Sequence, residues 1–263
     1  MKPFIKWAGG KRWLVDSPQF EIPEFDGRYI EPFLGGGAVF FHLAPDQAIL
    51  SDVNPKLVNV YNAIRTDWRR VEAELKKMQR LHSKEYYYEE RGRERRTDHT
   101  KAAQFLYLNR TCWNGLYREN LSGKFNVPIG TKSQVIMPDD NFEEASIALQ
   151  SAKISACDFE ETLQDAGTGD LVFLDPPYTT AHNTNGFVKY NQKIFSWDDQ
   201  IRLRNCVEAA RCRGAKIVMT NANHQTIREL YSDLVTPKIV SRSSVISGNK
   251  SSRGQTTEAL FLF

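Results

Sequence analysis

The chain has 263 residues, of which 41% are hydrophobic and 25% are charged, and its formal net charge is +3. This length and apolar share are sufficient for one large domain, or one domain with an insertion, without a disulfide or a metal to hold the fold together. The four cysteines have no CxxC spacing and no apolar run approaches about 18 residues, which excludes a zinc ribbon, a disulfide framework and a membrane-spanning helix. With no recognisable signal peptide, we expect a cytoplasmic protein with reduced thiols.

The charge is distributed unevenly along the chain. Residues 65–118 contain 14 Lys and Arg against 8 Asp and Glu, and residues 237–256 contain 4 Lys and Arg and no acid. Because these two excesses together are larger than the net charge, the rest of the chain is acidic. Two basic segments on an acidic body favour contact with a polyanion, although solvated helix faces would give the same composition.

The stretch Phe4-Ile5-Lys6-Trp7-Ala8-Gly9-Gly10-Lys11 combines a tryptophan with two glycines and two lysines. Gly9 and Gly10 allow a tight turn or the close approach of a ligand, and Lys11 begins a helical segment. The GxxxxGK[ST] spacing of a phosphate loop is absent, so an ordinary ATP site is not expected. Trp7 is interpreted either as the wall of a pocket or as a buried tryptophan.

A strand, a glycine turn and an apolar helix are predicted between residues 28 and 43. The turn contains Glu31-Pro32-Phe33-Leu34-Gly35-Gly36-Gly37, and a second strand, 48–51, ends at Asp52. Glycines after a first strand admit a ligand against the backbone, and an acid after the second strand suits the two hydroxyls of a ribose. This pattern indicates a cofactor that contains adenosine, without separating NAD from S-adenosylmethionine. The lack of GxGxxG spacing and the presence of Glu31 favour the sulfonium compound, because a carboxylate suits a cation.

Residues 55 to about 150 show helical spacing and charged runs in place of the preceding strands and glycine turn. Apolar residues recur at helical spacing over 57–81, the charged run 84–101 is typical of a solvated helix or loop, and 102–108 are predicted to form a buried helix. Turn dipeptides predict a hairpin over 109–130. Between and beside these turns lie the aromatic and basic side chains of Trp113, Tyr117, Arg118, Lys124 and Phe125. Such a mixture suits contacts to bases and phosphates, although a plain surface hairpin is the alternative.

The C-terminal part is predicted to return to alternating strands and helices. The expected strands are 153–157, which leads into Asp158, then 171–174, 215–220, 234–240 and 259–263, and the expected helices are 197–213 and 225–232. Two loops complete this region: an aromatic loop with Phe187, Tyr190, Phe195 and Trp197, and a basic loop of glycines and serines at 247–254.

The motif Asp175-Pro176-Pro177-Tyr178 directly follows the buried strand 171–174. Proline has no N–H, so the strand stops at Asp175, and the motif lies beyond the strand ends, where open α/β sheets bind ligands. The Asp175 carboxylate and the Pro176 carbonyl can accept both N–H bonds of an exocyclic amino group, which frees its lone pair. Tyr178 can stack on the base that carries this group. A strand cap followed by a turn is the alternative interpretation.

Together these motifs resemble the Dam family of DNA adenine-N6 methyltransferases, in the class where the cofactor motif precedes the recognition region and the Asp-Pro-Pro-Tyr motif. The resemblance covers nearly the whole chain, from residues 6–11 to the closing Glu258-Ala259-Leu260-Phe261. It implies a Rossmann-like α/β fold with a seven-stranded sheet and a reversed last hairpin. It also implies a catalytic domain, 1–55 and 151–263, and an inserted DNA-recognition domain of helices and a hairpin, 56–150.

The resemblance also implies roles for single residues. The S-adenosylmethionine pocket is expected to contain Trp7, Lys11, Phe33, Gly35, Asp52, Asp158 and Asp175, and the expected catalytic residues are Asp175, Pro176 and Tyr178. The expected DNA-binding residues are Lys6, Arg110, Trp113, Asn114, Leu116, Arg118, Asn126 and Pro128. In the family's pattern Lys6 resembles a contact to the first base pair, and Arg118 resembles a guanine reader. Leu116 and Pro128 resemble contacts to a thymine methyl, Arg110 and Asn126 resemble phosphate contacts, and Trp113 resembles an aromatic that inserts beside the target.

The expected activity is methyl transfer from S-adenosylmethionine to N6 of an adenine flipped out of double-stranded DNA, in GATC or a related short site. We expect a monomer that needs no metal, either paired with a restriction enzyme or acting alone. Cytosine-N4 methylation uses the same amino-group chemistry but is disfavoured, because Asp175 replaces a serine at the head of the motif. A DNA-binding module without catalysis is disfavoured by the intact motif, and a nicotinamide-dependent oxidoreductase is the weakest alternative.

Overall fold

The computed structural model describes residues 1–120, 122–180, 195–243 and 255–263, so Phe187, Tyr190 and the basic loop at 247–254 lie outside the described residues. The chain divides into two units. The first comprises Met1–Val15, Leu34–Asp46 and Asp52–Ala156, and the second comprises Asp16–Phe33, Gln47–Ser51 and Cys157–Phe263. In this division the segments 1–15 and 34–46 group with the residues after Asp52. The separate DNA-recognition domain at 56–150 stays a prediction.

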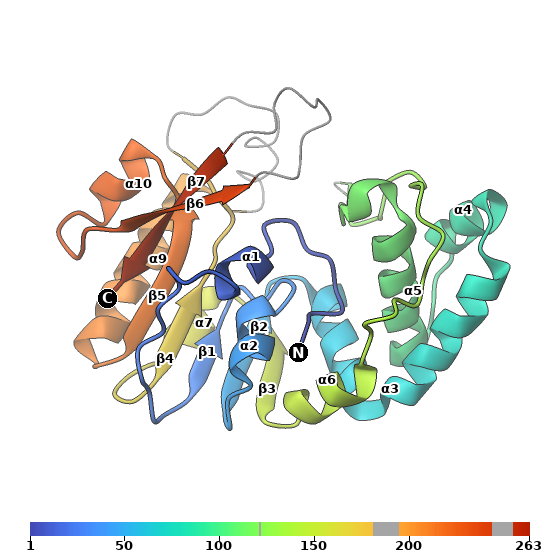
Figure 1. The fold of residues 1–263 in the computed structure, drawn as a ribbon, viewed down its shortest axis with the longest axis horizontal. Helices are drawn as coiled ribbons and strands as arrows, with labels where there is room; N and C mark the ends of the chain where they lie inside the picture. The colour runs from blue at the N-terminus through green and yellow to red at the C-terminus, as the bar shows by residue number, and fades with distance from the viewer. Residues whose placement is uncertain (121, 181–194, 244–254) are drawn as a thin grey trace. The chain divides into compact units, whose positions relative to one another are not determined.

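Seven strands form a sheet in the order β3-β2-β1-β4-β5-β7-β6, which confirms the predicted α/β fold. The strands are β1 (Tyr29–Glu31), β2 (Ala48–Asp52), β3 (Ala152–Ala156), β4 (Leu171–Leu174), β5 (Lys216–Ala222), β6 (Lys238–Ser243) and β7 (Gln255–Leu262). In the second unit β4 pairs in parallel with both β1 and β5. β7 runs antiparallel to β5 and to β6, so the last hairpin is reversed, as expected (Figure 1).

The core of the second unit surrounds β4, whose four residues are all apolar and fully buried. A parallel strand with both faces covered buries every side chain, which explains the uninterrupted apolar run. Helix α9 (Trp197–Cys212) adds Leu203 and Val207 to this core and begins with a capping box at Ser196. Phe195 and Trp197, the described members of the predicted aromatic loop, pack into the core as well. The remaining described helices of this unit are α7 (Phe159–Leu163) and α10 (Gln225–Leu230).

Helices make up most of the first unit. They are α1 (Arg12–Val15), α2 (Ala38–Leu43), α3 (Pro55–Leu81), α4 (Lys84–Gly92), α5 (Asp98–Thr111), the 3-10 turn η1 (Trp113–Gly115) and α6 (Phe142–Leu149). The Asn54 side chain accepts the N–H groups of Lys56 and Leu57 and so caps the long helix α3. α3 packs along α5 (Figure 1), and both bury most of the apolar residues predicted from helical spacing, although Leu81 at the end of α3 is exposed. Among the described residues, no helix has the length and hydropathy needed to cross a bilayer.

Two predicted elements differ from the structure. The predicted hairpin 109–130 begins with the last turn of α5 and continues through η1. Its described β-bridges are Cys112–Ile129 and Glu119–Phe125, and neither belongs to a regular strand. The strand predicted from residue 234 begins only at Lys238, because the N–H of Leu234 bonds to Tyr231 in the turn after α10. Pro237, which has no N–H to offer a sheet, directly precedes the strand.

Candidate active site

Asp175 stands where β4 ends in the second unit. The parallel register pairs Leu174 with Met219, so the following residues of the two strands, Asp175 and Thr220, are neighbours. The Thr220 hydroxyl donates a hydrogen bond of 2.8 Å to Asp175 Oδ1. Pro176, which is buried, then turns the chain away from the sheet. The carboxylate is therefore held by a side chain of the neighbouring strand.

Tyr178 is fixed by a carboxylate at the other side of β5. Its hydroxyl donates a hydrogen bond of 2.5 Å to Glu258 Oε2, and Glu258 lies on β7 opposite Ala222 with only 2% of its surface exposed. Burial, followed by the negative charges of Asp175 and Glu258, raises the pKa of Tyr178 well above its usual value. The phenol therefore stays a neutral hydrogen-bond donor at physiological pH.

The backbone around the motif is tied to α9 and β5. The amide of the buried Gln200 approaches the Pro177 carbonyl at 3.5 Å and accepts a bond of 3.2 Å from Asn221. The Thr179 hydroxyl donates to the carbonyl of Phe195 at 2.7 Å. These polar side chains, together with Glu258, were not predicted as site residues. The one available signal was Glu258, an acid immediately before the apolar run 259–263.

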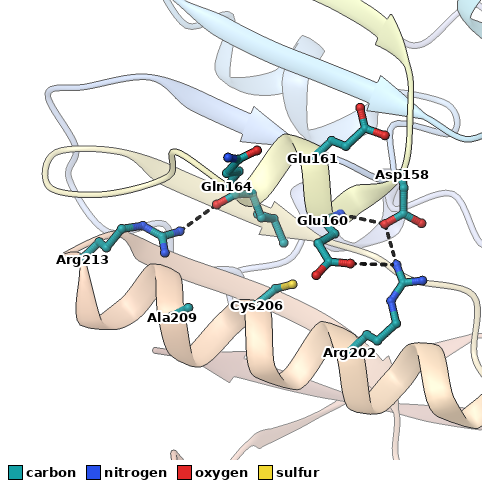
Figure 2. A pocket seen from close by; sticks show the side chains of 9 residues that line it. Asp158, Glu160, Glu161, Gln164, Arg202, Cys206, Ala209 and Arg213 are labelled. Atoms are coloured by element: carbon teal, nitrogen blue, oxygen red, sulfur yellow. Dashed lines mark hydrogen bonds and ion pairs between the residues drawn. The ribbon is translucent and has the colours of Figure 1, made fainter.

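Asp158 and Phe33, two of the predicted cofactor residues, also lie in the second unit. Phe33 stacks on Phe159 with ring centroids 5.5 Å apart. Asp158 caps α7, because its Oδ1 accepts the N–H of Glu160 at 3.0 Å, and the same atom binds Arg202 at 2.6 Å. Figure 2 shows this ion pair at one end of a pocket of about 620 Å³.

That pocket is a groove between α7 and α9. Figure 2 shows Asp158 and Glu160 of the α7 segment directed toward Arg202 of α9, while Glu161 points away from this helix. Asp158 is the one predicted cofactor residue that lines it, and the motif after β4 contributes none of its wall. The groove is therefore separate from the surroundings of Asp175, and we do not assign it to the cofactor.

Gly35 lies at the centre of a second group of predicted residues, in the first unit. Its φ is +47°, and a Cβ placed on it would lie 2.7 Å from Trp7 Cδ1, so only glycine fits against the tryptophan. The Gly35 N–H donates to Asp52 Oδ2 at 3.0 Å, and its carbonyl accepts the Tyr61 hydroxyl at 2.8 Å. Burial raises the pKa of Asp52, although N–H bonds from Asn54 and Gly35 oppose the shift. The structure thus brings together Trp7, Gly35 and Asp52.

Lys11 lies next to this group in sequence and is buried, with 3% of its surface exposed. Its ammonium donates a hydrogen bond of 2.7 Å to the carbonyl of Gly9, whose φ is +79°. Lys11 therefore closes the turn formed by the two N-terminal glycines. Its predicted part in closing the cofactor pocket stays a prediction.

Most of the predicted DNA-binding residues are exposed on the first unit. Lys6, Trp113, Asn114, Arg118, Asn126 and Pro128 are exposed, and Leu116 is half-buried. The Arg118 Nε donates to Asn126 Oδ1 at 3.0 Å, and the Asn126 N–H returns a bond to the Arg118 carbonyl at 3.2 Å. The Trp113 N–H bonds to the Pro128 carbonyl at 2.9 Å. The segments 113–118 and 126–128 therefore belong to one hydrogen-bonded loop.

Arg110 has different surroundings from the other predicted DNA-binding residues. It is buried rather than exposed, and its guanidinium makes a bidentate pair with Asp140 at 2.5 and 2.7 Å. It also donates to the carbonyls of Val135 and Phe4. These bonds make Arg110 an internal clamp in the described structure, and its predicted phosphate contact stays a prediction.

Comparison with known proteins places these features in a family. The chain matches the family described as D12 class N6 adenine-specific DNA methyltransferase over residues 7–246. It is 37% identical to a type II methyltransferase, M1.LlaDCHI, of Lactococcus lactis subsp. cremoris, over 99% of this chain and 94% of that protein. It is 35% identical to a type II methyltransferase, M.MjaIII, of Methanocaldococcus jannaschii, with 93% of each chain covered. It is 33% identical to a DNA adenine methylase of Vibrio cholerae, over all of this chain and 96% of that protein.

Proposed function

Because the chain belongs to the D12 class of N6 adenine-specific DNA methyltransferases, we propose that it methylates N6 of an adenine flipped out of double-stranded DNA. The recognition site is GATC or a related short sequence. S-adenosylmethionine supplies the methyl group as an electrophile bound to a sulfonium. The observation that carries this proposal is the motif after β4, where a fixed carboxylate, a rigid proline carbonyl and a neutral tyrosine occur together.

Each group of the motif has a separate task. The Asp175 carboxylate and the Pro176 carbonyl accept the two N–H bonds of the adenine amino group, which draws the nitrogen towards tetrahedral geometry and frees its lone pair. Thr220 orients Asp175 in advance, so little reorganisation is needed during transfer. Tyr178 stacks on the extruded base, which offsets part of the free energy of unstacking it. After transfer the extra proton leaves N6 for the Asp175 carboxylate or for water.

The proposed cofactor residues fit an adenosine compound in two respects. Asp52 offers carboxylate oxygens to ribose hydroxyls, and Gly35 leaves the backbone uncovered by any Cβ. Trp7 and Phe33 offer apolar ring faces, and Lys11 and Asp158 complete the proposed set. Each of these side chains suits S-adenosylmethionine by its own chemistry, and the proposed binding of the cofactor requires no metal.

The proposed DNA contacts divide into readers and anchors. Arg118 reads a guanine, Lys6 contacts the first base pair, and Leu116 and Pro128 touch a thymine methyl. Asn126 contacts a phosphate. Asn114 and the exposed Trp113 contact the duplex beside the target adenine. This set of readers supports GATC as the site.

The experiment that tests the function is labelled-methyl transfer to duplex DNA by the variants Asp175→Ala and Tyr178→Ala. Both should lose transfer while cofactor binding, measured by calorimetry, stays near the wild-type value. Asp198→Ala, at an exposed acid in the first turn of α9, is the matched control and should remain active. Transfer at the wild-type rate by either motif variant would refute the assignment.

The recognition site is tested in cells that lack DNA methylation. Expression of the chain there should produce N6-methyladenine at GATC in a genome-wide map. Arg118→Ala should relax one base position and lose about 1–3 kcal/mol of discrimination. Unchanged selectivity across single-base variants of the site would remove Arg118 from the readers.

A further inference from the structure

Asn109 is a fully buried polar residue in the last turn of α5. Its side-chain oxygen accepts the N–H of Lys6 at 3.1 Å, and its side-chain nitrogen donates to the carbonyl of Lys6 at 2.8 Å. One amide thus satisfies both backbone groups of one residue, as a neighbouring strand would. The two residues are 103 positions apart in the sequence, so the bond pair fixes the N-terminal segment onto α5.

The side chain of Lys6 reaches the turn that carries the proposed DNA readers. Its ammonium donates to the carbonyl of Asn114, and a Cβ placed on Gly115 would lie 2.6 Å from Lys6 Cδ. Asn114 and Gly115 have φ values of +57° and +63°, so the turn has the rare backbone conformation that leaves room for the lysine. The position of Lys6 and the shape of this turn therefore depend on each other.

Trp7, the next residue, contacts the glycine turn instead. It lies against Gly35 and stacks on Phe105 and Tyr117 with ring centroids 6.3 and 5.7 Å away. Phe105 lies one helical turn before Asn109 on α5, so one face of this helix holds both Lys6 and Trp7. Tyr117 belongs to the loop 113–118, which carries proposed DNA-reading residues, and its ring centroid lies 4.3 Å from that of Phe105.

We propose that Asn109 is a positioning residue that couples cofactor binding at the glycine turn to base reading by the loop 113–118. The coupling runs through Lys6 and Trp7, which Asn109 holds in one fixed arrangement. Lys6 faces the loop 113–118, and Trp7 faces the glycine turn. This inference rests on the proposed function. Its consequence is that cofactor and DNA each strengthen the binding of the other by the same factor, as linkage requires.

The test measures that factor for the full-length chain. The ligands are S-adenosylhomocysteine, which cannot donate a methyl group, and a short duplex containing GATC. Calorimetry gives the dissociation constant of S-adenosylhomocysteine with and without the duplex. Fluorescence anisotropy gives the dissociation constant of the duplex with and without S-adenosylhomocysteine. The wild type should show coupling of about fivefold or more. Asn109→Ala should reduce the factor to nearly one and lower discrimination against single-base variants of the site.

Gln104→Ala is the matched control on the same helix. Gln104 also donates two hydrogen bonds to backbone carbonyls, those of Glu90 and Arg93, but it does not contact Lys6 or Trp7 in any described bond. A merely structural loss on α5 would lower the stability of both variants without changing the coupling factor. Of these two variants, only Asn109→Ala should change the coupling factor.

A second variant keeps the proposal testable if Asn109→Ala does not fold. Tyr117→Leu removes the half-buried ring stacked on Trp7 and should also lower the coupling factor. Wild-type coupling and discrimination in the folded variants, or a factor of one in the wild type, would overturn the inference. Failure of the wild type to methylate DNA at all would instead overturn the proposed function, so the two failures are distinguishable.

Discussion

Two carboxylates hold the motif after β4, and they do so in different ways. Asp175 is a member of the motif and is oriented by Thr220, whereas Glu258 lies on β7 and acts through the Tyr178 hydroxyl. A hydrogen bond from a neutral phenol to a buried carboxylate is stronger than one between neutral groups. Glu258 therefore sets the direction of the Tyr178 ring without touching the base itself.

Tyr178→Phe separates the ring from its hydroxyl. The ring remains for stacking, but Glu258 loses a partner, so we expect methyl transfer to fall by about tenfold and unfolding free energy by about 1–3 kcal/mol. Single-turnover transfer and urea unfolding measure the two effects. Tyr178→Ala should be much slower than Tyr178→Phe. Equal rates for the two variants would show that stacking contributes nothing.

At the scale of an element, the glycine turn after β1 is shaped by what lies around it. The Gly35 backbone is bonded at its nitrogen to Asp52 and at its oxygen to Tyr61, while Trp7 occupies the space of a side chain. The turn is therefore fixed from three sides. Its residues cannot move to admit a larger side chain without displacing Trp7.

Gly35→Ala should weaken cofactor binding by at least about tenfold, because the added Cβ collides with Trp7 and the residue has a positive φ. The matched control is Gly92→Ala at the end of α4, where a Cβ would meet nothing within 4 Å and φ is not positive. Calorimetric titration with S-adenosylhomocysteine measures both. An unchanged dissociation constant for Gly35→Ala would show that the turn does not contact the cofactor.

Across the whole molecule, stability depends partly on an ion pair between distant segments, in which the carboxylate of Asp170 is buried and Arg28 is half-buried. Asp170, just before β4, receives Arg28 Nε at 3.1 Å and Nη2 at 2.6 Å, and the N–H groups of Arg28 and Gly167 as well. Burial by itself would raise the pKa of Asp170, but these bonds outweigh it and lower the pKa below its usual value. The ion pair joins β1 to β4 at the base of the sheet.

This lowered pKa predicts how stability changes with pH. The contribution of Asp170 is complete above the pKa of about 4 in the unfolded chain and is lost as pH falls through the lower folded value. Asp170→Asn should therefore cost about 2–4 kcal/mol at pH 7, and the difference from wild type should shrink as pH falls below about 4. Urea unfolding across this pH range measures it. Asp139→Asn, at an exposed pair with Lys2, is the control, and a constant difference for Asp170→Asn would contradict the assignment.

Local sequence patterns were sufficient to predict the α/β sheet, the order of most elements and the family. Buried strands such as 171–174, and helices such as 197–212, follow from apolar runs and spacing that are local properties of the chain. For the same reason, the sequence shows the order of the functional motifs along the chain, from the glycine turn to Asp-Pro-Pro-Tyr. The predicted ends of elements were wrong where tertiary contacts determine them, as at the predicted hairpin 109–130.

Contacts between distant segments determine which polar residues face inward, and these contacts could not be predicted. Arg110 was expected on DNA, yet it pairs with Asp140, 30 positions away. Glu258 reaches Tyr178 across 80 positions, and Asn109 reaches Lys6 across 103. An arginine or an asparagine has the same sequence signature whether its donors meet water, DNA or a buried carbonyl. The low dielectric of the interior makes such distant pairs obligatory once the fold forms, and no local pattern contains that information.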